Sequence, residues 1–474
     1  MKLQLENTTI ESAREHAAEG PVPATCRVTA VVTHPPMHDR VTIWVGLPLE
    51  GWNGRFQGSG GGGFAGGAPR GSFQPAAGGF AAASTDTGHE GSKGSFALDD
   101  QGRLDWQAIR NNAHLGIHEM TRIGKAVTEA FYGIAPKYAY FNGCSTGGRQ
   151  GLMEAQRYPT DYDGILSGCP AINWPKLHVE QLWGPLVMRQ SGHTVAACKL
   201  EQARTASIAA CDALDGVSDG VISHPDRCKF DAQSLVGTAA PGCPAFNAQD
   251  ASIVTKIWQG PRRQDGSFLW YGLGYGADFS GLSRVAGDPP EPQAMAITEQ
   301  WFRYFLTQDP NFDWETIDYD RYERFWDQSQ EEFGAVIGTD NPDLSAFRDH
   351  GGKIVLWHGL VDQLIYPGGT IDYYTRVRDE MGGAKETAKF LRFFLAPGVA
   401  HCGRGDGPPP AGHFDALMRW VEQGEAPETL DAVRRDESGR AVLSRPLCQY
   451  PQVAVYDGQG DPNVAASFTC RDER

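Results

Sequence analysis

The feature that most constrains the fold is a serine set between glycines, where a predicted strand meets a predicted helix. Residues 138–141 are β-rich and lead directly into Gly143-Cys144-Ser145-Thr146-Gly147. The glycines permit a tight turn, and a helix starting near Gly148 would direct the positive end of its dipole at the site. Strand, G-x-S-x-G turn and helix together predict a nucleophile elbow, which needs an α/β sheet with Ser145 exposed at the end of a strand.

Two later predicted strands end in the partners that such a serine needs. A G-x-S-x-G match alone arises by chance fairly often, so the presence of these partners decides whether Ser145 is predicted to be a nucleophile. The buried-strand run 353–357 leads into a loop with Asp362, and the run 390–395 leads into a loop with His401. The chain order serine, aspartate, histidine is the order expected after a nucleophile elbow. We predict that Ser145 attacks a carbonyl, His401 takes and returns the proton, and Asp362 fixes the imidazole tautomer. The alternative for Asp362 is an ordinary surface turn.

Cysteines adjoin both the predicted nucleophile and the predicted base. Cys144 precedes Ser145, and Cys402 follows His401. If the serine and histidine lie within hydrogen-bond reach, the two cysteine backbones must lie near each other, and a disulfide between them is geometrically plausible. Such a bridge would pin the two catalytic loops together.

An oxyanion hole requires two backbone amides directed at the developing negative charge. The amide of Thr146, the residue after the nucleophile, is the first candidate. The second should come from the glycine cluster at residues 58–63, where no side chain blocks the carbonyl, and we predict Gly62. The alternatives for this cluster are a flexible loop or a phosphate cradle. A dinucleotide-binding G-x-G-x-x-G fits poorly, because no helix pattern follows directly.

The organisation of the chain is that of an α/β unit interrupted by an insertion. Residues 1–174 and 347–474 carry strand runs and helical patterns, including a helical pattern over residues 106–131. Residues 175–346 contain many tryptophans and prolines and few clean strand patterns, so we predict a separate inserted domain there. With 41% hydrophobic and 21% charged residues, the 474-residue chain can bury a large core.

Charge and hydropathy exclude two classes of partner. A net charge of −16 argues against nucleic acid, because a phosphate-binding surface needs a basic field. No apolar run reaches the roughly 18 residues that would span a membrane. We therefore expect a small-molecule partner, and the oligomeric state stays open.

An acidic loop in the predicted insertion could bind a metal ion. Cys211 and Cys228 bracket this loop. Calcium takes six to eight oxygen ligands, mixing carboxylates with backbone carbonyls. The candidate ligands are the side chains of Asp212, Asp215 and Asp219 and the carbonyls of Val217 and Val221. The alternative is a solvated acidic turn; the cysteine bracket favours the metal loop.

These motifs resemble those of the tannase/feruloyl esterase family. The similarity lies in the segment 143–150 around Ser145, the segments 155–159 and 161–165, the His401-Cys402 pair, the acidic loop and the closing segment 445–451. It extends over nearly the whole chain, from about residue 22 to 470.

The resemblance implies an α/β-hydrolase core with an inserted lid domain, a Ser–Asp–His triad and a Cys144–Cys402 disulfide. It also implies a structural calcium in the lid. Cys448 and Cys470 bracket the last segment, and with Cys211 and Cys228 they are predicted to form disulfides. Val236 stands where a partner for Cys243 is expected, so the pairing of four cysteines stays open: Cys26, Cys169, Cys198 and Cys243.

The resemblance implies a serine hydrolase acting on esters of phenolic or other aromatic acids, with gallate, hydroxycinnamate and terephthalate monoesters as candidates. A different hydrolase on the same fold, or an idle binding protein, is the alternative. Disulfides would place the protein in an oxidising compartment, secreted or periplasmic, although residues 1–20 lack the apolar core of a signal peptide. Scattered buried thiols in a cytosolic protein are the alternative.

Overall fold

A nine-stranded sheet forms the centre of the computed structural model, which describes residues 4–472. The strand order is β1-β2-β3-β5-β4-β6-β7-β10-β11. In this order, neighbouring strands from β1 to β5 pair antiparallel. Neighbouring strands from β5 to β11 pair parallel. Their bounds are Thr8–His16 (β1), Thr25–Val32 (β2), Val41–Pro48 (β3), Arg55–Ser59 (β4), Ala81–Thr85 (β5), Tyr138–Cys144 (β6), Gly164–Gly168 (β7), Lys353–Gly359 (β10) and Leu391–Ala396 (β11). The strands predicted before Ser145, Asp362 and His401 are confirmed as β6, β10 and β11.

Helices cover both faces of the sheet because alternate strand residues point to opposite sides. Phe141, Ile165 and Ile354 pack against helices on one face, and their neighbours Tyr140, Leu166 and Val355 pack on the other. The first face carries α3 (Gly116–Tyr132), α4 (Thr146–Arg157), α11 (Ser345–His350) and α12 (Pro367–Glu380), and the second carries α14 (His413–Gln423). The segment predicted as helical, 106–131, comprises α2 (Trp106–Arg110), a π-helical turn (Asn111–Leu115) and α3.

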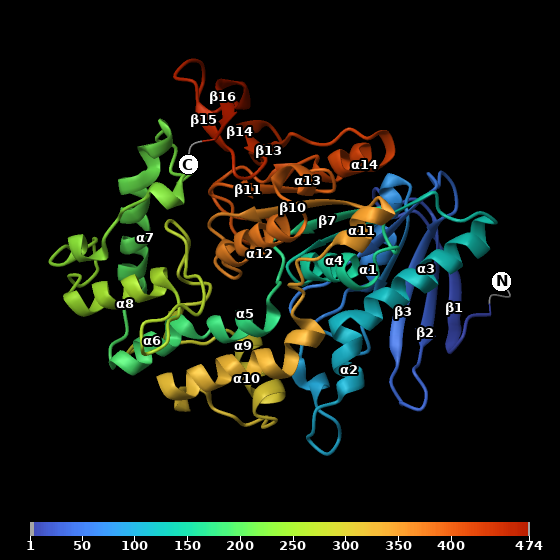
Figure 1. Ribbon diagram of the computed structural model, residues 1–474, viewed down its shortest axis with the longest axis horizontal. Coiled ribbons are helices and arrows are strands. Elements are labelled where there is room, and N and C mark those ends of the chain that lie inside the picture. Colours follow the sequence, from blue (N-terminus) through green and yellow to red (C-terminus); the bar gives the residue numbers. More distant parts are fainter. Residues whose placement is uncertain (1–3, 473–474) are drawn as a thin grey trace.

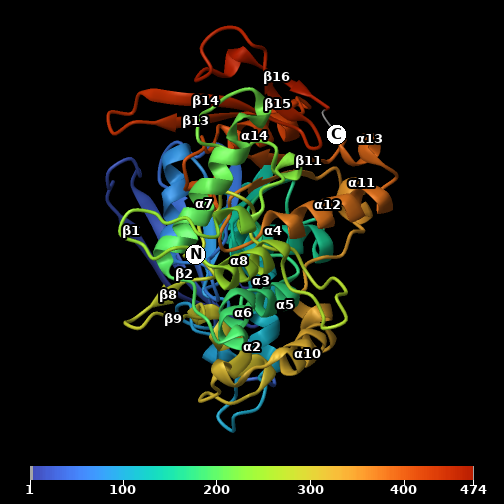
Figure 2. The ribbon, with the colours of Figure 1, turned by 90° about the vertical axis from the view of Figure 1, so that its left-hand side faces the viewer.

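The chain between β7 and α11 forms the predicted insertion. It contains α5 (Trp174–Glu180), α6 (Trp183–Ser191), α7 (Ala197–Cys211), α8 (Ala248–Gln259), α9 (Ala296–Gln300) and α10 (Tyr319–Ile337). Its helices share one apolar cluster that includes Trp301, Trp314 and Trp326. Figure 1 shows this segment, green to yellow, beside and below the sheet, and Figure 2 gives the perpendicular view. The inserted segment ends ahead of α11, because Phe347 packs in the core of the sheet.

Short elements complete the described chain. They are α1 (Pro69–Phe73), β8 (Val285–Ala286), β9 (Glu291–Pro292), α13 (Ala384–Thr387), β12 (Pro410–Ala411), β13 (Thr429–Arg435), β14 (Ala441–Cys448), β15 (Val453–Tyr456) and β16 (Phe468–Arg471). The strands β12 to β16 form two small sheets above the nine-stranded sheet, coloured red in Figure 1. Within residues 4–472, no helix is long and apolar enough to cross a membrane.

Four disulfides cross-link the chain. The predicted pairs Cys144–Cys402, Cys211–Cys228 and Cys448–Cys470 are confirmed. The pairing of Cys243, which the sequence left open, is with Cys198, 45 residues earlier. Cys26 and Cys169 are free and buried.

Candidate active site

The predicted nucleophile sits on a strained turn between β6 and α4. Ser145 has φ 63° and ψ −126°, a backbone conformation that L-residues rarely adopt. The glycines beside it are required by close backbone contacts. A Cβ on Gly143 would lie 2.4 Å from the carbonyl carbon of Gly147, and one on Gly148 would lie 2.5 Å from the carbonyl oxygen of Gly168. The glycines thus let the chain turn sharply enough to present Ser145 at the end of the strand.

The structure brings the predicted acid and base into contact. His401 Nδ1 lies 2.8 Å from Asp362 Oδ2, and the Asp362 side chain is fully buried. The other carboxylate oxygen accepts the backbone N–H groups of Leu364 and Ile365, each at 2.9 Å. Because the aspartate is held in place by its own loop, it can fix which His401 nitrogen carries the proton.

A second histidine, which sequence reasoning missed, also contacts the triad aspartate. His358 is fully buried at the end of β10, and its Nε2 lies 3.3 Å from Asp362 Oδ2 and 2.8 Å from the carbonyl oxygen of Ile365. Both neighbours are acceptors, so Nε2 carries the proton. Burial alone would raise the pKa of Asp362, but hydrogen bonds from His358 and His401 outweigh it and hold that pKa well below its usual value. The only sequence signal for His358 was its place four residues before Asp362.

The free thiol of Cys169 completes the surroundings of the triad. Its Sγ, a carboxylate oxygen of Asp362 and a ring nitrogen of His401 all lie within 4.8 Å of one another. Burial raises the pKa of the Cys169 thiol well above its usual value, and the charge of Asp362 raises it further. The thiol therefore stays protonated beside the ionised aspartate.

The predicted oxyanion-hole residues lie at the same cavity as Ser145. Thr146 and Gly62 both line it, and the amide of Gly61 next door already donates to Gln150 Oε1 at 2.9 Å. A Cβ at Gly62 would meet no atom within 4 Å, so this position is open. The roles of the Thr146 and Gly62 amides stay predictions.

The catalytic cavity has a volume of about 600 Å³ and is shared between the core and the insertion. The core contributes Ser145, His401 and the glycine loop. The apolar wall is lined by Ala171, Trp174, Leu177, Met295, Ile297, Leu364 and Ile365. Ser145 and His401 line one largely apolar cavity, and a serine so placed is suited to acyl transfer from an apolar acid.

The Cys144–Cys402 disulfide joins the two catalytic loops directly. The Cα atoms of the two cysteines are 6.0 Å apart, and 258 positions separate them in sequence. Replacing both by alanine should lower kcat about a hundredfold, because small misplacements of catalytic groups are that costly. The free energy of unfolding should also fall by about 5 kcal/mol in the chain-entropy model. Steady-state kinetics and thermal melts on the purified variant check both.

The matched control removes Cys448 and Cys470, whose disulfide lies in the C-terminal sheets. That variant should lose stability but keep kcat. An unchanged kcat in the Cys144/Cys402 variant would mean that the bridge does not position His401.

The acidic loop offers oxygen donors and is held closed by the Cys211–Cys228 disulfide. Asp212 Oδ1 accepts backbone N–H groups of Asp219 and Val221 at 3.1 and 3.2 Å, and Asp215 Oδ1 accepts that of Val217 at 3.0 Å. Burial raises the pKa of Asp219, and the charges of Asp215 and Asp212 raise it further against the opposing effect of Arg445. Mutual repulsion of carboxylates is what a bound cation would relieve, so the donor set fits calcium.

Two details of the loop differ from a preassembled metal site. Asp219 Oδ2 pairs with Arg445 Nη2 at 2.5 Å. Among the His, Cys, Asp and Glu side chains of residues 4–472, two groups of three have possible metal-ligand atoms within 4.8 Å of one another: Cys169–Asp362–His401 and His118–Glu154–Asp161. The three aspartates of the acidic loop do not form such a group. The three carboxylates are therefore not gathered around one point in this structure.

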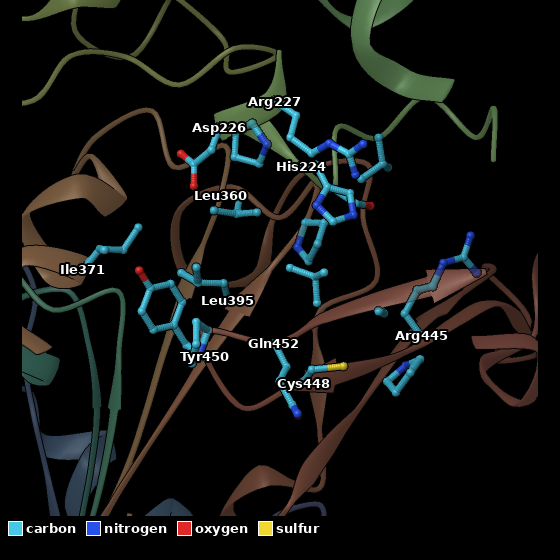
Figure 3. A pocket seen from close by; sticks show the side chains of 18 of the residues that line it. His224, Asp226, Arg227, Leu360, Ile371, Leu395, Arg445, Cys448, Tyr450 and Gln452 are labelled. Atoms are coloured by element: carbon cyan, nitrogen blue, oxygen red, sulfur yellow. The ribbon is translucent and has the colours of Figure 1, made fainter. Parts of the chain in front are cut away.

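A second cavity of about 480 Å³ lies between the acidic loop, the ends of β10 and β11, and the C-terminal strands. Figure 3 shows Leu360, Leu395, Arg445 and Tyr450 around it. Among the described residues, it shares no lining residue with the catalytic cavity. At the wall of this second cavity, the Asp219–Arg445 ion pair joins the acidic loop to β14.

Comparisons with known proteins identify the family of this chain. A family model described as tannase and feruloyl esterase matches residues 26–471. A probable feruloyl esterase of Arthroderma benhamiae is 43% identical over 458 residues, covering 94% of this chain and 85% of the relative. A mono(2-hydroxyethyl) terephthalate hydrolase of Piscinibacter sakaiensis is 30% identical over 547 residues, covering 97% and 87%. The crystal structure of feruloyl esterase B from Aspergillus oryzae superposes with a TM-score of 0.88 at 26% identity, covering 99% of this chain and 98% of that one. The protein is thus a carboxylic ester hydrolase and belongs to the tannase and feruloyl esterase family.

Proposed function

We propose that this esterase cleaves esters of phenolic and related aromatic acids through an acyl-enzyme intermediate. The observation that carries the proposal is the His401–Asp362 contact at a cavity that holds Ser145 and is walled by Trp174 and aliphatic side chains. A flat aromatic acid fits such an apolar wall better than a charged or strongly hydrated acid does. The names of the relatives, feruloyl esterases and a terephthalate-ester hydrolase, support the same class.

The mechanism follows from the positions of the side chains. His401 accepts the Ser145 proton as the hydroxyl oxygen attacks the ester carbonyl, and the charged imidazole is stabilised by Asp362. The amides of Thr146 and Gly62 stabilise the oxyanion. His401 then protonates the departing alcohol, and a water molecule activated by the same histidine releases the acid from Ser145.

A side-by-side assay tests the proposed substrate class. Methyl ferulate, methyl gallate and mono(2-hydroxyethyl) terephthalate should each be hydrolysed with a higher kcat/KM than methyl butyrate, which offers no ring to the apolar wall. The ratio between the three aromatic esters also distinguishes a phenolic-ester hydrolase from a terephthalate-monoester hydrolase. Equal or faster hydrolysis of methyl butyrate would overturn the proposal.

We also propose that calcium binds the acidic loop, held by Asp212, Asp215 and Asp219 and the carbonyls of Val217 and Val221. The ion would neutralise the carboxylates and brace the lid, while all bond-making steps stay with the triad. A chelator should therefore lower the melting temperature, and added calcium should restore it. At a calcium concentration about 100 times Kd, the stabilisation is about 3 kcal/mol.

A pair of variants makes the calcium test specific. The double change Asp212→Asn and Asp215→Asn should remove the response to calcium. Asp226→Asn alters an exposed acid of the same disulfide-closed loop and should keep it. Identical melting curves of the wild type with chelator and with calcium would leave only an acidic turn.

Four disulfides fit an oxidising compartment, and we propose that the protein is secreted or periplasmic. Thiol titration of the denatured, unreduced protein from its native source should find only the two free cysteines, Cys26 and Cys169. Ten reactive thiols would contradict this location.

A further inference from the structure

The catalytic cavity carries positive charge without an acidic side chain to balance it. The charged side chains that line it are Arg70 and Arg404, and no aspartate or glutamate among the described residues lines it. Burial lowers the pKa of His178, which also lines the cavity, to about 3, so this histidine adds no charge near neutral pH. This cavity stands out in a protein whose net charge is −16.

Neither arginine is used by the fold. Arg70 follows the glycine loop on α1, and Arg404 follows His401 and Cys402; both are exposed. In the described part of the chain, neither guanidinium forms a hydrogen bond or an ion pair. The acid nearest to Arg404 in sequence, Asp406, is 3.1 Å from Arg204 instead. An unpaired guanidinium group at a cavity is suited to a carboxylate, which it can bind through two parallel N–H donors.

We propose that the substrate is an aromatic ester that also carries a free carboxylate, bound by Arg70 and Arg404. This inference rests on the proposed esterase function and narrows its substrate class. The two arginines enter from different loops. Arg404 lies three residues after His401, which protonates the departing alcohol, so Arg404 belongs to the loop on the alcohol side. Arg70 follows the predicted oxyanion loop, residues 58–63, in the sequence. The carboxylate can therefore belong to the alcohol part or to the acid part of the ester.

Two matched pairs of esters test the proposal and distinguish these positions. Carboxymethyl ferulate against ethyl ferulate places the charge on the alcohol. Mono(2-hydroxyethyl) terephthalate against 2-hydroxyethyl benzoate places it on the acid. In at least one pair, the charged ester should have a kcat/KM about ten- to thirtyfold higher at low salt, since the two ion pairs, with Arg70 and with Arg404, contribute up to about fivefold each. This preference should shrink as ionic strength rises from about 10 mM to about 500 mM, because exposed charges are screened.

Variants assign the preference to the arginines. In Arg70→Gln and Arg404→Gln, the ratio of charged to neutral kcat/KM should fall about fivefold each, mainly through KM. Arg14→Gln removes the same charge from the exposed edge strand β1 and should leave the ratio unchanged. A ratio near one in both pairs, or a preference that survives the double Arg70/Arg404 variant, would overturn the inference. If neutral ferulate and benzoate esters are not hydrolysed either, it is the proposed function that fails.

Discussion

Replacing Ser145 by alanine should lower kcat by about a millionfold, the loss typical when the nucleophile of such a triad is removed. The change should not disturb the fold, because alanine adopts the same strained backbone as serine and no hydrogen bond in residues 4–472 uses the Ser145 hydroxyl. Stopped assays with methyl ferulate at high enzyme concentration measure the residual rate, and thermal melts verify that the variant is folded.

The Ser145 variant is decisive for the whole site. Turnover within tenfold of the wild type would show that another group attacks the ester, and the assignments of His401 and Asp362 would fall with it. A variant that melts at the wild-type temperature and still binds aromatic acids would separate the loss of chemistry from a loss of the cavity.

Asp362→Asn should lower kcat about ten-thousandfold, because an amide can present an N–H to His401 and favour the wrong imidazole tautomer. The expected loss is smaller than for Ser145, since nucleophile and oxyanion donors stay in place. Asp250→Asn is the matched control. Asp250 is also fully buried and binds His193 and Lys199 at 2.7 and 2.6 Å, but inside the insertion. This control should lower stability and leave kcat within a few-fold.

The Asp362 variant also has a defined signature in pH. The pKa of Asp362 is depressed in the folded protein, so its ionised form contributes stability that is complete above the unfolded pKa near 4 and lost as pH falls further. The stability difference between wild type and variant should therefore be constant above about pH 5 and shrink below about pH 4. A kcat near the wild-type value in Asp362→Asn would contradict its orienting role.

The local parts of the site could be predicted from sequence because each was encoded within a few residues. The glycines around Ser145 and the strand runs before Asp362 and His401 are short patterns with a fixed chain order. The strand β1 was missed because its residues are polar and mostly exposed. Helices α5 and α6 of the insertion were not resolved because most of their side chains are buried, which obscures a single apolar stripe.

The remaining features depend on contacts between distant segments. His358 was passed over because only the folded loop brings its Nε2 to the triad aspartate. The Cys198–Cys243 bond could not be chosen by spacing, since sequence alone does not fix disulfide connectivity. The charge of the catalytic cavity depends on Arg70 and Arg404, 334 positions apart in the numbering, which no local pattern connects.

The Cys144–Cys402 bond has a topological consequence. It turns the chain between these residues into a covalent ring that contains the whole insertion and two smaller disulfide loops. A single peptide-bond cleavage within the ring opens it without dividing the molecule, so Ser145 and His401 stay on one covalently connected species. A protease that cuts one exposed loop within this ring would therefore leave the segments with Ser145 and His401 covalently joined.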